Sequence, residues 1–445
     1  MGPKGLCVYL LAEILDRVCN LSGVGPRPRV IHNCQHNPQA STRRTGAFGS
    51  PTGPDSEDSG QDLNDKTRPS RASFTILGHW PSARTSPYPR KRIGLLVTQA
   101  WINRIATAVP PHDIHHAFVE FGLYAVADCH KRMVFGRMVT LADIEHRYAI
   151  IEPGPMPRDK VLDVGGFYRR GAFPTTAARM AWYEPHAIQL AMKAVSQLEE
   201  GDFSHLIVAS CTGFAAPGLD FQIMRAAGLP DSTHRTIVGF MGCFAAVNSL
   251  KIADQIVRAD RRARVLVVNL ELCSLHLQED FQNIPKMLSF LLFGDGASAA
   301  LITAEPDGIA LGRFRAAIIP RSDDLITWKI GDQGFEMHLS GQVPGRIRRW
   351  LQEFGSALIP SDRPNLWAVH AGGRSILDAV QQGLSLQPDA LHYSREILRN
   401  YGNMSSATLM FVLDRILADK DARGSGLGMA FGPGLSVETF RFERP

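Results

Sequence analysis

Short apolar runs alternate with longer segments in which apolar residues recur at every third or fourth position, from about residue 93 to the end of the chain. Runs of the first kind are typical of buried strands, and segments of the second kind are typical of amphipathic helices. The expected strands are residues 94–110, 205–210, 236–240, 264–272, 297–303, 366–372 and 427–442. The expected helices are residues 175–199, 243–260, 342–359, 374–384 and 405–419. Strands and helices that alternate in this way predict an α/β architecture with buried sheets.

The order of strand, crossover helix and strand occurs twice, with the changeover around residues 305 to 330. We therefore predict two doubly wound βαβαβ halves, residues 93–305 and residues 306–445, packed into one five-layered unit. Residues 1–92 differ in kind, because they are rich in Pro, Gly, Ser, Thr, Arg and Asp and have no sustained apolar period. We expect this stretch to be a disordered, dispensable tail or an extension upstream of the true start codon; a regulatory arm is the alternative.

Composition excludes several classes of protein. The chain of 445 residues is 44% hydrophobic but has no apolar run of about 18 residues, so we expect a globular protein without a membrane span. The formal net charge of +5 comes from residues 1–92, and the near-neutral remainder gives no support for nucleic-acid binding. The seven cysteines include no CxxC pair, and Glu13 and Asp16 interrupt the apolar segment at the start of the chain. We therefore expect no signal peptide and a cytoplasmic location.

Three side chains far apart in the sequence stand in glycine-marked turns where a strand should lead into a helix or loop: Cys243, His370 and Asn403. Cys243 should begin a helix whose unpaired amides and macrodipole favour a thiolate, so we expect a lowered thiol pKa. His370 should project from a strand end and accept the thiol proton, and Asn403 should lie in the turn before a helix. A thiol, an imidazole and a carboxamide can hold an acyl group as a thioester and stabilise a carbanion beside it.

Each of these residues also has an ordinary structural interpretation. A free cysteine is commonly a small buried core residue. A histidine at a strand end is usually a satisfied structural residue, and asparagine is a standard residue at helix starts. Only the combination of Cys243, His370 and Asn403 favours a catalytic centre.

Five segments in order along the chain resemble the signature segments of the chalcone and stilbene synthase family, the type III polyketide synthases: GCFAAVNSLKIA, LLFGDGASAALI, HAGGRSILD, YGNMSSAT and AFGPGLSVETF. The likeness runs from about residue 99 to the C-terminus. The segments CTGFAAPGLD, EHRYAIIEP and ELCSLHLQ are more similar to the bacterial branch than to the plant enzymes.

The resemblance implies a thiolase-like fold, an obligate homodimer and a catalytic centre at Cys243, His370 and Asn403. It implies an acyltransferase that loads an acyl-CoA starter on the cysteine, extends it with malonyl-CoA by decarboxylative Claisen condensation and cyclises the product. Coenzyme A thioesters would be the substrates, with no metal or other cofactor. We expect a fatty or medium-chain starter and an alkylpyrone or alkylresorcinol product.

The resemblance also implies residues that shape the cavity and the dimer. Phe293 matches the aromatic gate between the coenzyme A tunnel and the cavity, although an ordinary core phenylalanine is the alternative. Pro217 matches a turn near the dimer contact, and Ala216 matches the residue that reaches towards the partner's cavity. The remaining cavity positions depart from the plant enzymes, which carry small hydroxyl residues or a second gating aromatic there: Cys211, Cys273, His276 and Met337.

Basic residues are expected where coenzyme A enters, because its phosphates are anionic. Arg132 matches a phosphate-contacting arginine of the family, and Lys131 and Arg137 are plausible helpers. A solvated basic face is the alternative. Cys129 and Gly136 fall where the family carries further lysines, which leaves the phosphate contacts open.

Three other functions are compatible with parts of this pattern. A β-ketoacyl carrier-protein synthase shares the fold and the triad but takes malonate from a carrier protein. A cysteine hydrolase would use Cys243 and His370 and admit water. A thiolase-fold partner without catalysis would not need the intact triad.

Overall fold

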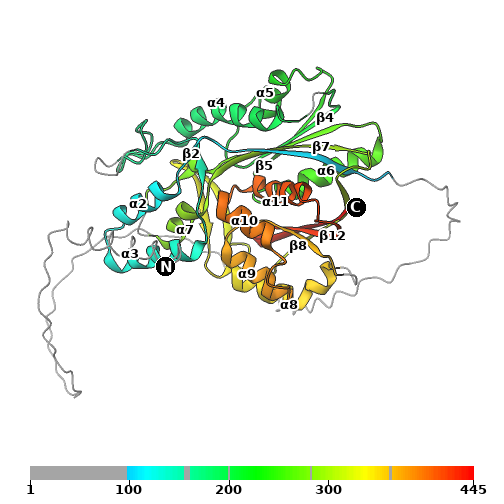
Figure 1. Cartoon of the computed structure of the whole chain (residues 1–445). Coiled ribbons are helices and arrows are strands. Elements are labelled where there is room, and N and C mark those ends of the chain that lie inside the picture. The colour runs from blue at the N-terminus through cyan, green and yellow to red at the C-terminus, as the bar shows by residue number, and fades with distance from the viewer. Residues whose placement is uncertain (1–97, 155–160, 199–200, 281–282, 360–362) are drawn as a thin grey trace, which may run out of the picture. The chain divides into compact units, whose positions relative to one another are not determined.

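The computed structural model describes residues 98–154, 161–198, 201–280, 283–359 and 363–445 (Figure 1). The predictions for residues 1–92, and for the part of the first expected strand before residue 98, lie outside these ranges. No helix in the described part is both long and apolar enough to cross a membrane.

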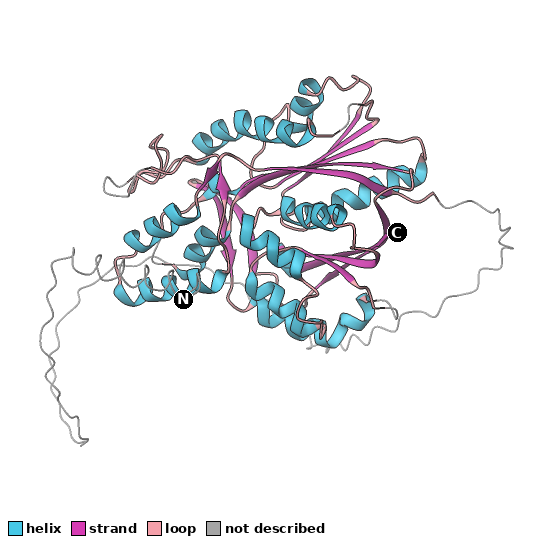
Figure 2. Ribbon diagram, viewed as in Figure 1, coloured by secondary structure: helices cyan, strands magenta, loops and turns pink. Residues whose placement is uncertain are grey.

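A nine-stranded sheet runs through the described residues (Figure 2). Its strands, in order across the sheet, are β11 (Leu366–Val369), β12 (Gly424–Gly432), β13 (Ser436–Arg444), β8 (Ile309–Ile318), β1 (Trp101–Ala108), β7 (Asp295–Thr303), β6 (Val265–Leu272), β4 (His205–Ser210) and β5 (His234–Gly239). Two small two-stranded antiparallel sheets accompany it: β2 (His112–Asp113) with β3 (Tyr148–Ala149), and the hairpin of β9 (Ile326–Gly331) and β10 (Gly334–Leu339).

The two halves of the sheet repeat one plan. In the first half, β4 is parallel to β5 and β6, and the crossovers are α5 (Leu219–Ala226) and α6 (Ala245–Ala259). In the second half, β11 is parallel to β12, and α9 (Arg374–Gly383), α10 (His392–Tyr401) and α11 (Ser406–Ala418) lie between them in the chain. Each half is completed by antiparallel strands, β7 and β1 in the first and β13 and β8 in the second.

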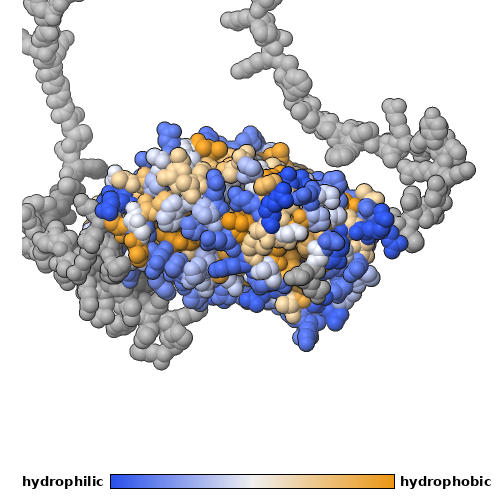
Figure 3. All heavy atoms as spheres, turned by 90° about the horizontal axis from the view of Figure 1, so that it is seen from above, coloured by the Kyte–Doolittle hydropathy of each residue, from blue (hydrophilic) through white to orange (hydrophobic). Residues whose placement is uncertain are grey.

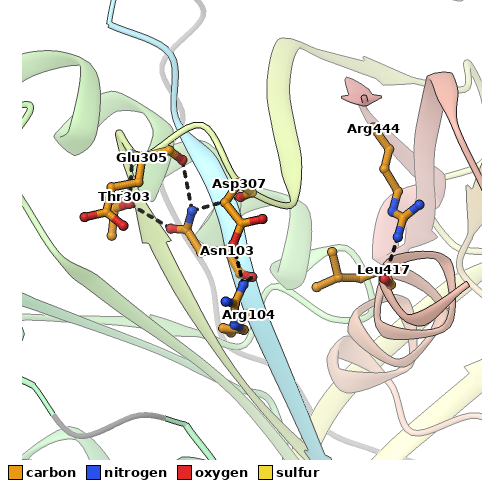
Figure 4. A network of polar contacts seen from close by, with 7 residues as sticks. All are labelled: Asn103, Arg104, Thr303, Glu305, Asp307, Leu417 and Arg444. Atoms are coloured by element: carbon orange, nitrogen blue, oxygen red, sulfur yellow. Dashed lines mark hydrogen bonds and ion pairs between the residues drawn. The ribbon is translucent and has the colours of Figure 1, made fainter. Parts of the chain in front are cut away.

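The changeover between the halves is held by a polar network around Asn103 of β1 (Figure 4). Its side-chain amide donates to the carbonyls of Glu305 and Asp307 at 3.0 and 2.9 Å, and its oxygen accepts from Thr303 Oγ1 at 2.7 Å. Arg104 pairs with the Asp307 carboxylate at 2.6 Å. These contacts fix the turn from β7 into β8, so that β1 pairs with both strands and joins the two halves into one sheet.

The layers follow from where the apolar faces are buried. Residues of α6 and α11 pack with strands of both halves in one core, so these helices form the middle layer. On the far side of the first half lie α4 (Thr176–Val195) and α5, and on the far side of the second lie α8 (Val343–Leu358) and α9 (Figure 1). The predicted five-layered arrangement is therefore confirmed. Arg444 of β13 donates to the Leu417 carbonyl at 2.8 Å and ties the last strand to α11.

Among the described residues, five helices have no counterpart among the expected elements: α5, α10, α2 (His115–Ala125), α3 (Cys129–Ala142) and α7 (Ile284–Leu292). The last three pack against one another. Only Phe135 and Ala142 of α3 are buried, so its apolar period is too weak to be seen in the sequence. The five expected helices match α4, α6, α8, α9 and α11 to within four residues at each end.

The outer surface over α4 and α5 is the face that Figure 3 shows. Apolar side chains there are interspersed with many hydrophilic ones. This mixture is ordinary for the outer layer of a globular protein, because polar groups cannot cover the whole surface.

Candidate active site

Cys243 lies in the turn between β5 and α6. Gly242 before it has φ +85°, and a β-carbon added there would lie only 2.3 Å from Cδ of Pro433. This close approach explains why glycine precedes the cysteine. The helix begins at Ala245, two residues after Cys243. The Cys243 sulfur accepts a weak hydrogen bond from Ser405 Oγ at 3.6 Å.

His370 follows β11 directly and is 2% exposed. Its backbone N–H donates to Met429 of β12 at 2.8 Å and so continues the pairing of the two parallel strands. Neither ring nitrogen has a hydrogen-bond partner within the described residues. Buried polar atoms are normally paired. The ring is thus available for a ligand.

Asn403 lies between α10 and α11 and is 3% exposed. Its backbone pairs with the chain at Phe293: the Asn403 N–H donates to the Leu292 carbonyl at 2.9 Å, and Gly294 donates back at 3.0 Å. The side-chain amide is oriented at both ends, because Nδ2 donates to a backbone carbonyl at 3.2 Å and Oδ1 accepts from the Ser405 N–H at 2.8 Å.

The structure brings the three predicted residues to one place. Ser405 contacts both Cys243 and Asn403. The carbonyl that accepts from Asn403 is that of Gly372, and a β-carbon on this glycine would lie 3.4 Å from Nε2 of His370 and 3.9 Å from Nδ2 of Asn403. Three segments therefore meet: the turn after β5, the turn after β11, and the connection between α10 and α11. The hydrogen bonds of the described residues include none between Cys243 and His370.

Cys243 opens into a cavity of about 700 Å³, counting its open mouth. All five predicted cavity residues line it: Phe293, Cys211, Cys273, His276 and Met337. His370 and Asn403 do not line it and border it only through neighbouring residues. Sequence reasoning missed several lining residues, among them Trp328, Ile326, Phe290, Leu277, Lys286 and Ser405. Most of them lie on the β9–β10 hairpin and α7, where no element was predicted.

One wall of the cavity is tied together around His276. Its Nε2 donates to the Thr212 carbonyl at 2.7 Å, and its Nδ1 accepts from the Phe335 N–H at 2.9 Å. The ring stacks on Phe335 with centroids 4.1 Å apart, and Trp328 Nε1 donates to the Cys211 carbonyl at 2.8 Å. Burial lowers the pKa of His276 to about 3. This histidine therefore stays neutral and structural, anchoring the β9–β10 hairpin to the turn after β4.

Burial also governs the charges at the centre. It raises the pKa of the Cys243 thiol to about 12 and lowers the pKa of His370 to about 4. The sequence predicted a lowered thiol pKa, and this is wrong for the geometry seen here. The helix begins two residues later than expected, and within the described residues no imidazole is hydrogen-bonded to the sulfur, so desolvation of the thiolate dominates.

Glu271 is a buried acid that sequence reasoning missed. It lies on β6 and accepts hydrogen bonds from the Cys211 N–H and Thr212 Oγ1, each at 2.9 Å, and from Ser406 Oγ at 2.6 Å. Burial raises its pKa to about 7. A glutamate inside an apolar strand is the sequence signal that could have found it, because buried acids without a role are rare.

The predicted coenzyme A contacts lie on α3, which packs against α7 and α9. Arg132 uses Nε and Nη2 to donate to the Val126 carbonyl at 3.0 and 2.9 Å, which ties α3 to the end of α2. Arg137 is exposed and Lys131 is half-buried. None of the three lines the cavity, so their role in phosphate binding stays a prediction. The described residues contain no group of three or more His, Cys, Asp or Glu that could hold a metal ion.

Comparisons with known proteins agree with this arrangement. Residues 98–306 match the N-terminal domain of chalcone and stilbene synthases, and residues 313–443 match the C-terminal domain. Bisdemethoxycurcumin synthase of Oryza sativa subsp. japonica is 34% identical over 276 residues, which cover 57% of this chain and 69% of that protein. The alpha-pyrone synthesis polyketide synthase-like Pks18 of Mycobacterium tuberculosis is 32% identical over 313 residues, which cover 64% of this chain and 77% of that protein.

Solved structures share the fold. PKS-I from the brown alga Ectocarpus siliculosus superposes with a TM-score of 0.69 at 27% identity, covering 78% of this chain and 98% of that one. The type III polyketide synthase domain of Steely1 from Dictyostelium gives a TM-score of 0.70 at 22% identity, covering 78% and 99%, which shows the fold alone. The chain therefore belongs to the chalcone and stilbene synthase family and is an acyltransferase of the type III polyketide synthase class.

Proposed function

We propose that this enzyme loads an acyl group from an acyl-CoA starter onto Cys243, extends it with malonyl-CoA and cyclises the product. The observation that carries the proposal is the meeting of Cys243, His370 and Asn403 beside one cavity, with both His370 ring nitrogens unpartnered in the described structure. A buried imidazole without a partner costs free energy that a purely structural histidine would not need to spend.

Loading requires one proton to move. His370 takes the proton from the Cys243 thiol, and the thiolate attacks the starter carbonyl and expels coenzyme A as its thiolate, which the imidazolium protonates. Because burial opposes both charges when they are separate, the thiolate and imidazolium stabilise each other only as a close pair. A small movement of either turn must bring the ring to the sulfur.

Extension uses the carboxamide. The malonyl thioester carbonyl accepts hydrogen bonds from Asn403 Nδ2 and from the ring N–H of His370, which is neutral again after loading, so that loss of carbon dioxide leaves an enolate with its charge on that oxygen. The enolate carbon attacks the acyl-Cys243 carbonyl, and the Cys243 thiolate leaves. Asn403 Nδ2 spends one hydrogen on the Gly372 carbonyl, which leaves the second for the substrate.

An apolar chain suits the cavity. Ile326, Met337, Phe290 and Leu277 line it beside Cys243. We therefore favour a fatty or medium-chain starter and an alkylpyrone or alkylresorcinol product. The printed name of the Mycobacterium tuberculosis relative, which refers to alpha-pyrone synthesis, supports the pyrone.

We also propose that the enzyme works as a homodimer. The edge strand β5 and the turns beside it expose Phe214, Ile237 and Met241 to 40, 46 and 39%. Large apolar side chains on an open sheet edge favour contact with a second chain. Ala216 and Pro217 lie in the same region, between β4 and α5. Sedimentation analysis of the purified protein tests this, and a monomer at micromolar concentration would contradict it.

The decisive experiment is incubation with malonyl-CoA and a panel of acyl-CoA starters, with products identified by mass spectrometry. Chain-extended pyrone or resorcinol is the expected result. Free acid alone would identify a cysteine hydrolase, a requirement for malonyl carrier protein would identify a carrier-dependent synthase, and no product from any starter would leave a non-catalytic partner. The Cys243→Ala variant is the matched control, because it should lose all acyl loading and keep measurable malonyl-CoA decarboxylation.

A further inference from the structure

Arg147 is fully buried at the junction between the gate residue Phe293 and the strand-like segment of Asn403. Its Nη1 donates to the carbonyls of Phe290 and Phe293, each at 2.8 Å. These carbonyls belong to the last turn of α7 and its C-cap. Carbonyls at a helix end lack intrahelical donors and carry partial negative charge, so a guanidinium is well suited to hold them.

The stem of Arg147 contacts the opposite side of the same junction. A β-carbon on Gly402 would lie 2.7 Å from Cγ of Arg147, and one on Gly294 would lie 3.5 Å from its Cβ. Gly402 directly precedes Asn403, and Gly294 directly follows Phe293. One side chain therefore touches both segments that form the bridge between Phe293 and Asn403.

A second set of contacts orients the guanidinium. Nε donates to Nδ1 of His115 at 3.1 Å, and the guanidinium carbon lies 5.8 Å from the centre of the Phe118 ring. Burial and the positive charge of Arg147 lower the pKa of His115 to about 3, so its imidazole stays neutral and Nδ1 can accept. The nearby carboxylates of Asp113 and Asp295 act against the cost of burying the Arg147 charge.

This arrangement is expensive for a structural role alone. Nη2 of Arg147 is buried and has no hydrogen-bond partner within the described residues. An apolar side chain of similar volume is often as stabilising as a buried charge, or more so. The cost suggests that the arginine is kept for the geometry that it imposes.

We propose that Arg147 is a positioning residue for condensation: it holds the end of α7 against the Asn403 segment, so that the Phe293 ring and the Asn403 amide keep a fixed relation to Cys243. The inference rests on the function proposed above for Asn403. Loss of the two carbonyl contacts displaces the amide that stabilises the enolate, while Cys243 is held by β5 and α6 and keeps its place.

Arg147→Lys, with Arg179→Lys as matched control, tests the proposal in the full-length protein. Arg179 is equally buried and also donates to backbone carbonyls, those of Pro174, Leu275 and Leu277, but on the cavity wall beside His276. Acyl loading on Cys243 and malonyl-CoA decarboxylation are measured separately. We expect Arg147→Lys to lower kcat for decarboxylation at least about tenfold more than the loading rate. Arg179→Lys should lower both by similar factors. Equal losses in the Arg147 variant would overturn the proposal.

Hydrogen exchange gives a readout that does not depend on activity. The amides of Gly294 and Asn403 donate across the bridge, so peptides that contain them should exchange faster in Arg147→Lys than in Arg179→Lys. Unchanged exchange would overturn the proposal even if the wild type proved inactive. Faster exchange in an enzyme that neither loads nor decarboxylates would overturn only the proposed function. If Arg147→Lys fails to fold, His115→Leu is the second variant. It should also slow decarboxylation more than loading and speed up exchange at Gly294 and Asn403, with smaller effects. Unchanged rates and exchange in His115→Leu would overturn the proposal.

Discussion

The cavity wall around His276 and the turn around His370 contain two buried histidines with opposite surroundings. His276 uses both ring nitrogens, one for the Thr212 carbonyl and one for the Phe335 N–H, and stacks on an aromatic ring. His370 is also buried, but neither of its ring nitrogens has a hydrogen-bond partner within the described residues. A histidine with both ring nitrogens hydrogen-bonded to protein stabilises the structure. A buried histidine with neither ring nitrogen hydrogen-bonded to protein can bind or react with a substrate.

The largest effect is expected when the His370 imidazole is replaced by a ring of similar size that cannot accept a proton. His370→Phe should lower acyl loading by at least about a thousandfold, because the thiol loses its base. It should change the free energy of unfolding by less than about 1.5 kcal/mol, since the new ring has a similar volume and no side-chain hydrogen bond within the described residues is lost. Trapping of acyl-Cys243 by mass spectrometry and urea unfolding check the two parts. A stability loss as large as the activity loss would break the comparison.

Asn403 is intermediate between His276 and His370 in its hydrogen bonds to protein, because one Nδ2 hydrogen is donated to the Gly372 carbonyl and the second is left for the substrate. Asn403→Ala should lower malonyl-CoA decarboxylation by about a hundredfold, the usual effect of removing one oxyanion donor. Acyl loading on Cys243 should change only a few-fold. Separate assays of carbon dioxide release and acyl-enzyme formation measure this, and equal loss of both steps would indicate a folding defect.

The pH dependence of Cys243 alkylation sharpens the comparison. Burial raises the pKa of the Cys243 thiol to about 12, so without an imidazolium beside it the thiol is almost wholly protonated at pH 7 and its reaction with iodoacetamide accelerates as the pH rises. A nearby imidazolium lowers that pKa. At pH 7, Cys243 in His370→Phe should therefore react at least about tenfold more slowly than Cys243 in the wild type. The rate in the variant should keep rising up to pH 10. Peptide mapping distinguishes Cys243 from the other thiols. Identical profiles would mean that His370 does not act on the sulfur.

The smallest effect on activity is expected in the cavity wall. His276→Phe keeps the aromatic stack but leaves the Thr212 carbonyl and the Phe335 N–H without partners. It should cost about 2 kcal/mol of unfolding free energy and reduce turnover less than about tenfold. Urea unfolding and steady-state kinetics check this against His370→Phe. A variant that keeps full stability and loses activity would make His276 a reacting group and reverse the interpretation of the wall.

The local pattern was sufficient for much of the fold. Apolar residues at helical spacing predicted α4, α6, α8, α9 and α11, and apolar runs predicted most strands, because each of these elements buries a continuous face. It was insufficient for α3 and the β9–β10 hairpin, whose few buried positions depend on neighbours far away in the chain. The cavity wall formed by Trp328 and Ile326 was missed for that reason.

The sequence by itself determined that a thiol, an imidazole and a carboxamide each stand in a glycine-marked turn, since turn chemistry is local. Only the tertiary structure decided that these turns meet, because the parallel strands β5 and β11 belong to different halves and long-range packing brings their ends together. It also decided which of two similar histidines has both ring nitrogens hydrogen-bonded within the described residues and which has neither. The hydrogen bonds of His276 with Thr212 and Phe335 join segments that are remote in the chain, so the residues next to His276 in the sequence could not predict them.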